Sequence, residues 1–198
     1  MSTAVLCTIG TLAMMASTRQ PLPLFDFAAN PALALTFASL DDRVMGGRSV
    51  SRMLPQRDYA SFVGELVLAG GGFASIRSTP AQPWDLRGSD GVELITRSDG
   101  PSYKVVVRTA SAPSISYQHD FGGGPEWRTC RLVWREFVPS YLGRVVADAP
   151  KLDVSAVTSL GFMLSKLTDV GQTNARAVDG PFQLDVRSVR TFCALPSA

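Results

Sequence analysis

Apolar and polar residues alternate in short runs along the chain from Ser61 onward. Within Tyr103–Thr109, one face would carry Tyr103 and the valines two and four residues later, while Lys104, Val106 and Arg108 would take the other face. Because successive side chains of a strand point to opposite faces, this period predicts strands with one buried face. Eight strands are predicted on this basis: Ser61–Leu68, Phe73–Thr79, Gly91–Ser98, Tyr103–Thr109, Ser114–Phe121, Trp127–Trp134, Ser159–Ser165 and Pro181–Phe192.

Glycine, proline and aspartate separate these segments, for example at Gly70–Gly72, Gly122–Gly124 and Asp179–Pro181. Such residues mark turns, and no long helical pattern lies between them. The arrangement predicts an all-β fold, a single-domain antiparallel β-sandwich or jelly roll. Two stretches lack the pattern: we expect Phe137–Lys151, with two prolines, to be a long crossing loop and Leu167–Val178 to be a surface loop.

Composition narrows the class of function. The chain has 198 residues, 45% of them hydrophobic, and its formal net charge is +2, which gives no electrostatic reason to expect a nucleic acid as partner. Arginine supplies most of the positive charge, and its planar fork suits bidentate pairing at interfaces. Three cysteines without CxxC spacing and one histidine predict neither a disulfide framework nor an ordinary zinc site, so we expect no metal and no cofactor.

The N-terminal residues 1–23 differ from the rest of the chain. They contain no acidic residue, one arginine (Arg19) and an apolar stretch from Ala4 to Ala16. An organelle-targeting leader, a retained arm and a secretory signal all remain open from this pattern. We expect no direct membrane span, because the apolar run is well short of the roughly 20 residues that a transmembrane helix needs. The β-sandwich domain is predicted to cover residues 24–195.

Several motifs occur in a fixed order from Phe25 to Phe192. The main ones are DDRVMGGRS (Asp41–Ser49), GGFASIRS (Gly71–Ser78), GPSYKVVVRT (Gly100–Thr109), SYQ followed by EW (Ser116–Trp127), and GPFQL (Gly180–Leu184). Together they resemble the complex I intermediate-associated protein 30 family, and the resemblance covers nearly the whole chain.

The resemblance implies a galactose-binding-domain-like jelly roll, in agreement with the predicted strands. It also implies a non-enzymatic assembly factor, chaperone or bound accessory protein of mitochondrial respiratory complex I (NADH:ubiquinone oxidoreductase), with protein subunits of that membrane complex as partners. The expected location is the mitochondrial matrix side, peripheral to the inner membrane. Two alternatives stay open: a similar role on a chloroplast photosynthetic complex, and a carbohydrate-binding module, which would need exposed aromatic residues beside a groove.

The motif Val44, Met45, Gly46 and Gly47 is open to two interpretations. In the structural one, the glycines permit a tight backbone path while Val44 and Met45 fill the core. In the functional one, the charged residues around the motif frame a partner-binding loop. Further residues predicted to be structural are Gly72, Phe73, Tyr103 and Trp127.

Arginines on or near the predicted strands form a second candidate feature. A jelly roll has one concave sheet, and arginine and tyrosine side chains on it would grip carboxylates or amide edges of a partner. The alternative is a solvated strand face on which the arginines pair with acidic residues. The predicted partner-binding residues are Asp42, Arg43, Arg48, Arg77, Arg108, Tyr117 and His119.

Catalysis is not expected. His119 is the single histidine, and its neighbour Asp120 would point to the opposite face of a strand and could not orient it. Ser116 shares a strand with His119, but their spacing is not that of a nucleophile and its base, and no G-x-S-x-G elbow is present. The sequence therefore predicts a binding protein without a catalytic site.

Overall fold

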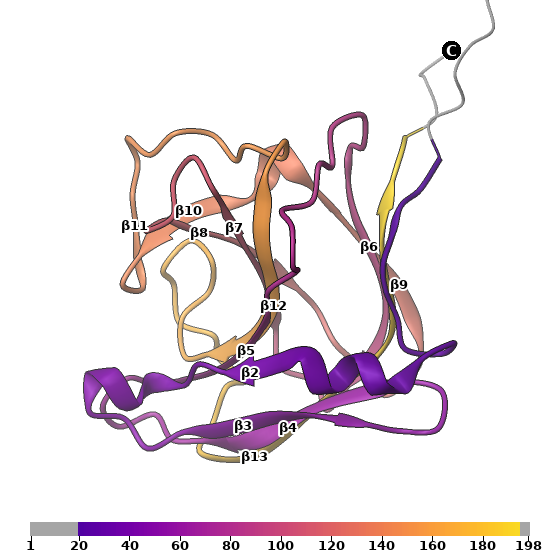
Figure 1. Cartoon of the computed structure of the whole chain (residues 1–198). Coiled ribbons are helices and arrows are strands. Elements are labelled where there is room, and N and C mark those ends of the chain that lie inside the picture. The colour runs from indigo at the N-terminus through magenta and orange to yellow at the C-terminus, as the bar shows by residue number, and fades with distance from the viewer. Residues whose placement is uncertain (1–19, 195–198) are drawn as a thin grey trace, which may run out of the picture.

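Two antiparallel β-sheets pack face to face in the computed structural model of this protein, which describes residues 20–194 apart from the side chain of Val44 (Figure 1). The six-stranded sheet has the order β3 (Val50–Pro55), β4 (Ala60–Leu66), β13 (Gly180–Phe192), β6 (Gly91–Ser98) and β9 (Arg128–Val133), with β1 (Pro23–Asp26) paired to β13. The seven-stranded sheet has the order β11 (Arg144–Val145), β10 (Val138–Tyr141), β8 (Ser116–Phe121), β7 (Tyr103–Thr109), β12 (Val157–Ser165), β5 (Phe73–Ser78) and β2 (Phe37–Ser39). The fold is an antiparallel jelly-roll β-sandwich.

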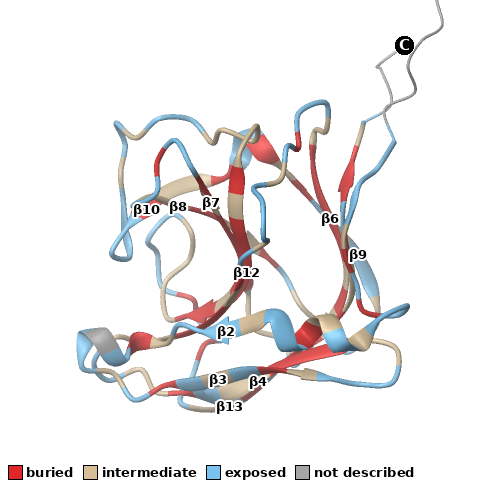
Figure 2. Ribbon diagram, viewed as in Figure 1, coloured by how far each residue is buried: buried red, intermediate tan, exposed pale blue. Residues whose placement is uncertain are grey.

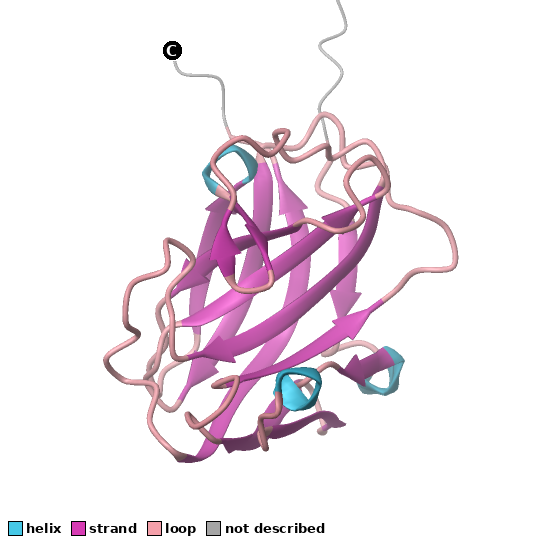
Figure 3. Ribbon diagram, turned by 90° about the vertical axis from the view of Figure 1, so that its left-hand side faces the viewer, coloured by secondary structure: helices cyan, strands magenta, loops and turns pink. Residues whose placement is uncertain are grey.

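Within residues 20–194, helix is limited to three short 3₁₀ turns, η1 (Pro31–Thr36), η2 (Asp42–Met45) and η3 (Trp134–Glu136). Figure 3 looks at the molecule from the side that carries β10 and β11 in Figure 1, and strands dominate this view. In the part of the chain that the structure describes, no helix has the length and apolar character needed to cross a bilayer.

The hydrophobic core lies between the two sheets and follows the predicted alternation. Tyr103, Val105 and Val107 on β7 are fully buried, and the core side of β12 and β13 is equally closed to solvent (Figure 2). The ring of Phe62 on β4 meets that of Tyr103 edge-on at 6.3 Å between centroids, so aromatic packing ties the two sheets together.

All eight predicted strands are present, with ends that differ by a few residues. Five strands, β1, β2, β3, β10 and β11, were not predicted. The expectation of a long crossing loop at Phe137–Lys151 is wrong, because β10 and β11 form a hairpin there and β10 pairs with β8. Proline is tolerated near a sheet edge. Pro139 lies on β10, which is separated from the edge of the sheet only by the two residues of β11.

Leu167–Val178 is a connection without a strand, as expected, and holds a single bridge between Leu167 and Thr173. The predicted leader or arm at residues 1–23 lies largely outside the described residues. Its nature, and the domain boundaries at residues 24 and 195, stay predictions.

Candidate functional site

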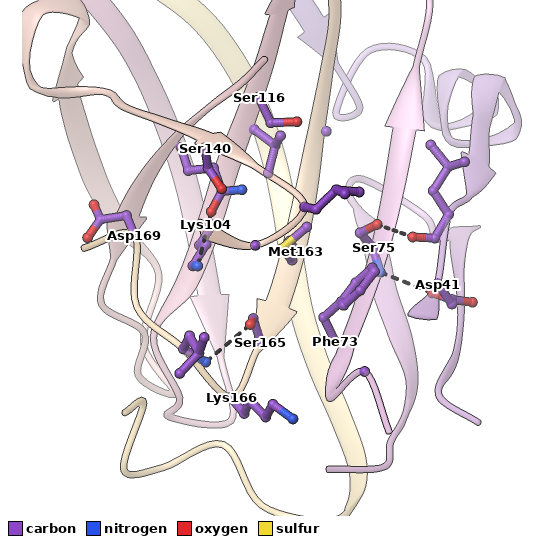
Figure 4. A pocket seen from close by; sticks show the side chains of 18 of the residues that line it. Asp41, Phe73, Ser75, Lys104, Ser116, Ser140, Met163, Ser165, Lys166 and Asp169 are labelled. Carbon is purple, nitrogen blue, oxygen red and sulfur yellow. Dashed lines mark hydrogen bonds between the residues drawn. The ribbon is translucent and has the colours of Figure 1, made fainter. Parts of the chain in front are cut away.

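A cavity of about 460 Å³ opens on the outer face of the seven-stranded sheet. Its floor carries Arg77 from β5, Lys104 and Arg108 from β7, Gln118 from β8 and Met163 from β12. We call it the arginine cavity. In Figure 4, Lys104 and Met163 lie between Asp169 on one side and Phe73 on the other.

The hollow follows from strand register. Val106, Gly161 and Arg77 stand opposite one another on β7, β12 and β5, so a glycine occupies the middle of the floor. A Cβ at Gly161 would stand 2.0 Å from the carbonyl oxygen of Ile76, so no side chain fits there. The absent side chain leaves space between the two arginine-bearing strands.

Two guanidinium groups line this space without acidic partners. Neither Arg77 nor Arg108 forms an ion pair with a carboxylate of the described residues. Burial, and then the nearby charge of Arg108, lowers the pKa of Arg77 to about 10. Burial also lowers the pKa of Arg108, which donates one hydrogen bond to the carbonyl oxygen of Pro113 at 3.0 Å while its buried Nε finds no acceptor in residues 20–194.

Three arginines of the six-stranded sheet pair with buried acids. Arg97 pairs with the buried Asp185 at 2.8 Å, and Glu93 accepts both Arg131 at 2.6 Å and Arg190 at 2.5 Å. These pairs match the alternative of arginines that pair with acids on a strand face. The two cavity arginines differ from these three in being half-buried without an acidic partner among the described residues.

Lys104 is buried at the floor, and its Nζ donates to Oε1 of Gln118 at 3.1 Å. Burial lowers the pKa of Lys104, while the charges of Asp120 and Asp169 oppose the shift. Burial and then the charge of Asp169 raise the pKa of the Asp120 carboxyl. This end of the cavity therefore holds its cation beside two acids, whereas no carboxylate of the described residues pairs with the arginines at the other end.

Exposed apolar side chains form two lips on opposite edges of the sheet. Met45, at the end of η2, has 52% of its surface exposed, and Leu142, in the β10–β11 hairpin, has 69% exposed. Both line the cavity. Leu142 and Gly143 form a two-residue turn with φ of 48° and 77°, although leucine is rare in the left-handed region.

Asp42 and Asp41 fix the loop that carries Met45. Asp42 accepts hydrogen bonds from the amides of Ser49 at 3.0 Å, Gly72 at 2.7 Å and Phe73 at 3.2 Å, and from the Ser49 hydroxyl. Asp41 accepts the amides of Ser51 at 2.9 Å and Ser75 at 3.0 Å. The prediction of Asp42 as a partner-binding residue is therefore corrected, because its side chain is fully buried and every described contact is internal.

The glycines of the motif have the predicted structural role, but Met45 does not. Gly46 has a φ of 78°, and a Cβ at Gly47 would stand 2.1 Å from Cγ of Asp42. Gly72 also has a positive φ, of 74°. Met45, at the end of η2, points to solvent and the cavity instead of the core. The structure does not describe the side chain of Val44.

Tyr117 and His119 do not reach the cavity. Both lie on the inward side of β8, which alternates with the side that carries Ser116 and Gln118. Tyr117 is buried and donates its hydroxyl to the carbonyl oxygen of Pro150 at 2.9 Å, and His119 packs edge-on against Phe137 at 5.3 Å. Their prediction as partner-binding residues on the same surface as Arg77 and Arg108 is corrected.

The other predicted residues divide between surface and core. Arg43 and Arg48 are exposed next to the cavity lip and do not line it. Tyr103 is a core residue whose hydroxyl donates to Asp99 at 2.8 Å, and Phe73 is half-buried in the cavity wall. Trp127 lies far from the cavity on the six-stranded sheet, between the guanidinium groups of Arg97 at 4.8 Å and Arg187 at 4.3 Å.

The sequence interpretation missed Met163, Leu142 and Gly161 as parts of the site. Met163 alternates with the core residues of β12 and could have been assigned to the outer face by its position alone. No pattern in the sequence pointed to Leu142, because the hairpin around it was not predicted. Within residues 20–194, no group of three or more His, Cys, Asp or Glu side chains could hold a metal ion.

Solved structures place the fold among β-sandwiches of the carbohydrate-binding-module type. A family 11 carbohydrate-binding module from Clostridium thermocellum, in complex with a β-1,3-1,4-mixed-linked tetrasaccharide, has a TM-score of 0.56 at 13% identity over 89% of this chain and 98% of the module. The solution structure of CtCBM11 gives 0.58 at 13% identity over 91% and 99%. An agarase gives 0.59 at 11% identity over 91% of this chain, which spans 25% of that enzyme. These likenesses show the fold.

The family is defined by the sequence. Residues 25–186 match the family model of Complex I intermediate-associated protein 30 (CIA30), and the chain belongs to this family. An uncharacterized protein of Schizosaccharomyces pombe is 30% identical over 176 residues, which cover 79% of this chain and 77% of that protein. The resemblance drawn from the motifs is confirmed.

Proposed function

We propose that this chain is a non-enzymatic assembly factor or bound accessory protein of mitochondrial respiratory complex I, and that it binds a protein subunit of the incomplete complex through the arginine cavity. The description of its family supports the link to a complex I intermediate. The expected location is the matrix side of the inner membrane.

The observation that carries the proposal is the unpaired state of Arg77 and Arg108. Half-buried cations without acidic partners cost stability, so a fold that keeps them gains from them elsewhere. A protein surface can supply the missing acceptors. Met45 and Leu142, exposed on opposite lips, supply the apolar contact that protein interfaces combine with arginine.

The same features weigh against a sugar ligand. Phe73 is the one aromatic residue among the described side chains that line the cavity, and it is half-buried in the wall. A groove that binds sugars by stacking needs exposed aromatic rings. Catalysis gains no support from His119, because it lies on the inward side of β8.

Affinity purification tests the proposal. A tagged chain expressed in its own cells is purified from mildly solubilised organelles and analysed by mass spectrometry, beside the double variant Arg77→Met/Arg108→Met. The matched control is Arg57→Gln/Arg135→Gln, which removes two exposed arginines that do not line the cavity. We expect complex I subunits with the wild type and the control, and a loss of about tenfold with the cavity variant.

Other outcomes would contradict the proposal. Recovery of photosynthetic-complex subunits would move the role to the chloroplast, and glycans without membrane-complex subunits would favour a carbohydrate-binding module. Equal recovery of complex I with the cavity variant would retain the assembly role and remove the arginine cavity from it.

A further inference from the structure

We infer that the arginine cavity binds an extended, acidic segment of polypeptide, with one aspartate or glutamate carboxylate between Arg77 and Arg108 and apolar neighbours against Met45 and Leu142. This inference deepens the proposed function, on which it rests, by naming the chemistry of the bound segment.

Charge is the first argument. Each guanidinium presents five N–H donors in a planar fork that matches the two oxygens of a carboxylate. Among described residues, Arg77 has no hydrogen-bond acceptor, and Arg108 uses Nη1 on the carbonyl oxygen of Pro113. The charge of Arg108 acts on Arg77, so the two cations repel each other. An anion placed between them removes this repulsion and supplies acceptors to both.

The balance of charge along the floor favours one carboxylate at the arginine end. Lys104 already lies within the influence of Asp120 and Asp169, both of which act to keep it protonated. The backbone N–H of Asp120 donates to Oδ2 of Asp169 at 2.9 Å, which holds the second acid in place. An acidic ligand is therefore drawn toward Arg77 and Arg108 and away from Asp169.

The lips identify the ligand as a peptide and not as a small anion. Met45 and Leu142 belong to loops at opposite edges of the seven-stranded sheet, and both side chains are exposed where they meet the cavity. A lone anion leaves them in water, whereas an extended chain that crosses the floor brings apolar side chains to each lip.

Size sets the length of the segment. The volume of about 460 Å³ falls in the range of roughly 300–1,000 Å³ typical of small-ligand sites. The cavity therefore takes a few residues of a chain, and a folded domain would contact only its lips. A few residues reach from one lip to the other only in an extended conformation, because a strand rises about 3.3 Å per residue and a helix about 1.5 Å.

The test is a selection with the purified full chain against a displayed library of random peptides of about seven residues. We expect enrichment of sequences in which Asp or Glu has Leu, Ile, Val or Met on both sides. The most enriched sequence is then synthesised, together with a version in which Gln or Asn replaces its acid. Fluorescence anisotropy should show that this replacement weakens binding by about tenfold or more.

Variants of the chain complete the test. Arg77→Met and Arg108→Met should each weaken the acidic peptide by about tenfold or more, while Arg57→Gln/Arg135→Gln leaves its affinity unchanged. Leu142→Asn should lower the affinity for the peptide. Inorganic phosphate, added as a competitor, should bind this variant as well as it binds the wild type. Circular dichroism and thermal melting of each variant separate a loss of binding from a loss of folding.

Three results would overturn the inference: selection of peptides without acidic residues, equal affinity for the acidic and amide peptides, or binding of the mixed-linked β-glucan tetrasaccharide in place of any peptide. Complex I subunits could still be recovered from cells with the wild-type chain in each case. Failure of the peptide chemistry is thereby distinguished from failure of the assembly role.

Discussion

The carboxylate of Asp42 accepts a hydrogen bond from the amide of Gly72 at 2.7 Å and so joins two loops that are 30 residues apart in the sequence. The same carboxylate binds Ser49, which begins the chain's return into β3. Because Met45 lies between Asp42 and Ser49, this contact fixes one lip of the arginine cavity relative to β5 on its floor. The position of the lip therefore depends on a fully buried aspartate.

Replacing Asp42 by alanine should destabilise the whole fold. The change leaves the amides of Ser49, Gly72 and Phe73 without their acceptor, and hydrogen bonds to a charged group contribute about 1.5–3 kcal/mol each. We expect the free energy of unfolding in urea to fall by about 3 kcal/mol or more. The adjacent exposed Arg43→Ala should change it by less than about 0.5 kcal/mol, and equal effects of the two changes would refute the internal role of Asp42.

The two motif glycines should respond differently to alanine. A Cβ at Gly47 would overlap Asp42, so Gly47→Ala must displace the buried carboxylate and should cost about 2–3 kcal/mol. Gly46 has open space around it and a φ of 78°, so Gly46→Ala should cost about 1–2 kcal/mol from backbone strain alone. Gly122→Ala, with neither restriction, is the control. Chemical denaturation of the three variants gives the order, and a reversed order would contradict the close approach.

Glu93 should give the fold part of its sensitivity to acid. Burial acts to raise the pKa of its carboxyl, but hydrogen bonds from Arg131 and Arg190 hold the pKa below its ordinary value of 4.5. A pKa that is lower in the folded state gives stability that is present in full above pH 4.5 and is lost as the pH falls through the folded value. Glu93→Gln should therefore flatten the decline of the free energy of unfolding below pH 4.5.

The control for this pH dependence is Glu136→Gln, since the side chain of Glu136 is 53% exposed while that of Glu93 is 3% exposed. Urea denaturation at a series of pH values compares the slopes of the wild type and both variants. An unchanged slope in Glu93→Gln would show that the ion pairs with Arg131 and Arg190 do not couple folding to protonation.

Alternation along the chain was enough to predict the central strands, because each has one face in the core and a side-chain period of two. The missed strands lie at or near sheet edges or are very short, and their burial is less regular. β11 has two residues, and β10 contains Pro139, a residue that argues against a strand. Their formation depends on the pairing of β10 with β8, a long-range contact that local sequence does not reveal.

The candidate site was predictable to the extent that it depends on strand faces. Alternation put Lys104 and Arg108 on one face of β7, and the structure has both on the cavity floor. Residue type alone misplaced Tyr117 and His119, although their odd positions on β8 put them on the core side with Phe121. Asp42 was misjudged because a charged residue in a glycine-rich loop suggests exposure, and two of its donors, the amides of Gly72 and Phe73, come from a loop about 30 residues away.

Leu142→Asn should stabilise the fold. A leucine with a φ of 48° costs about 1–2 kcal/mol, whereas asparagine followed by glycine suits a two-residue turn with two positive φ values. Since the leucine is 69% exposed, its replacement removes little packing, and we expect the free energy of unfolding to rise by about 1 kcal/mol. Thermal melting compares Leu142→Asn with Gly143→Ala, a change at the other turn residue that should destabilise the fold. A Leu142→Asn variant less stable than the wild type would mean that the leucine packs against the cavity wall.

Removing a cavity arginine should leave the fold as stable as before or more stable. Removing an arginine that pairs with a buried acid on the six-stranded sheet should instead destabilise it. Arg77 is half-buried and has no acidic partner among the described residues. Arg77→Met therefore keeps most of the side-chain volume and removes a desolvated charge that Arg108 repels. We expect its free energy of unfolding to stay level or rise by about 1 kcal/mol.

Arg97→Met is the matched comparison, because it leaves the buried carboxylate of Asp185 without the cation that binds it at 2.8 Å. Its free energy of unfolding should fall by about 2–3 kcal/mol. Urea denaturation at neutral pH measures both variants. Residues retained for binding and not for folding lower stability where they stand, so a loss in Arg77→Met equal to that in Arg97→Met would make Arg77 a structural residue and remove the support for a ligand at the arginine cavity.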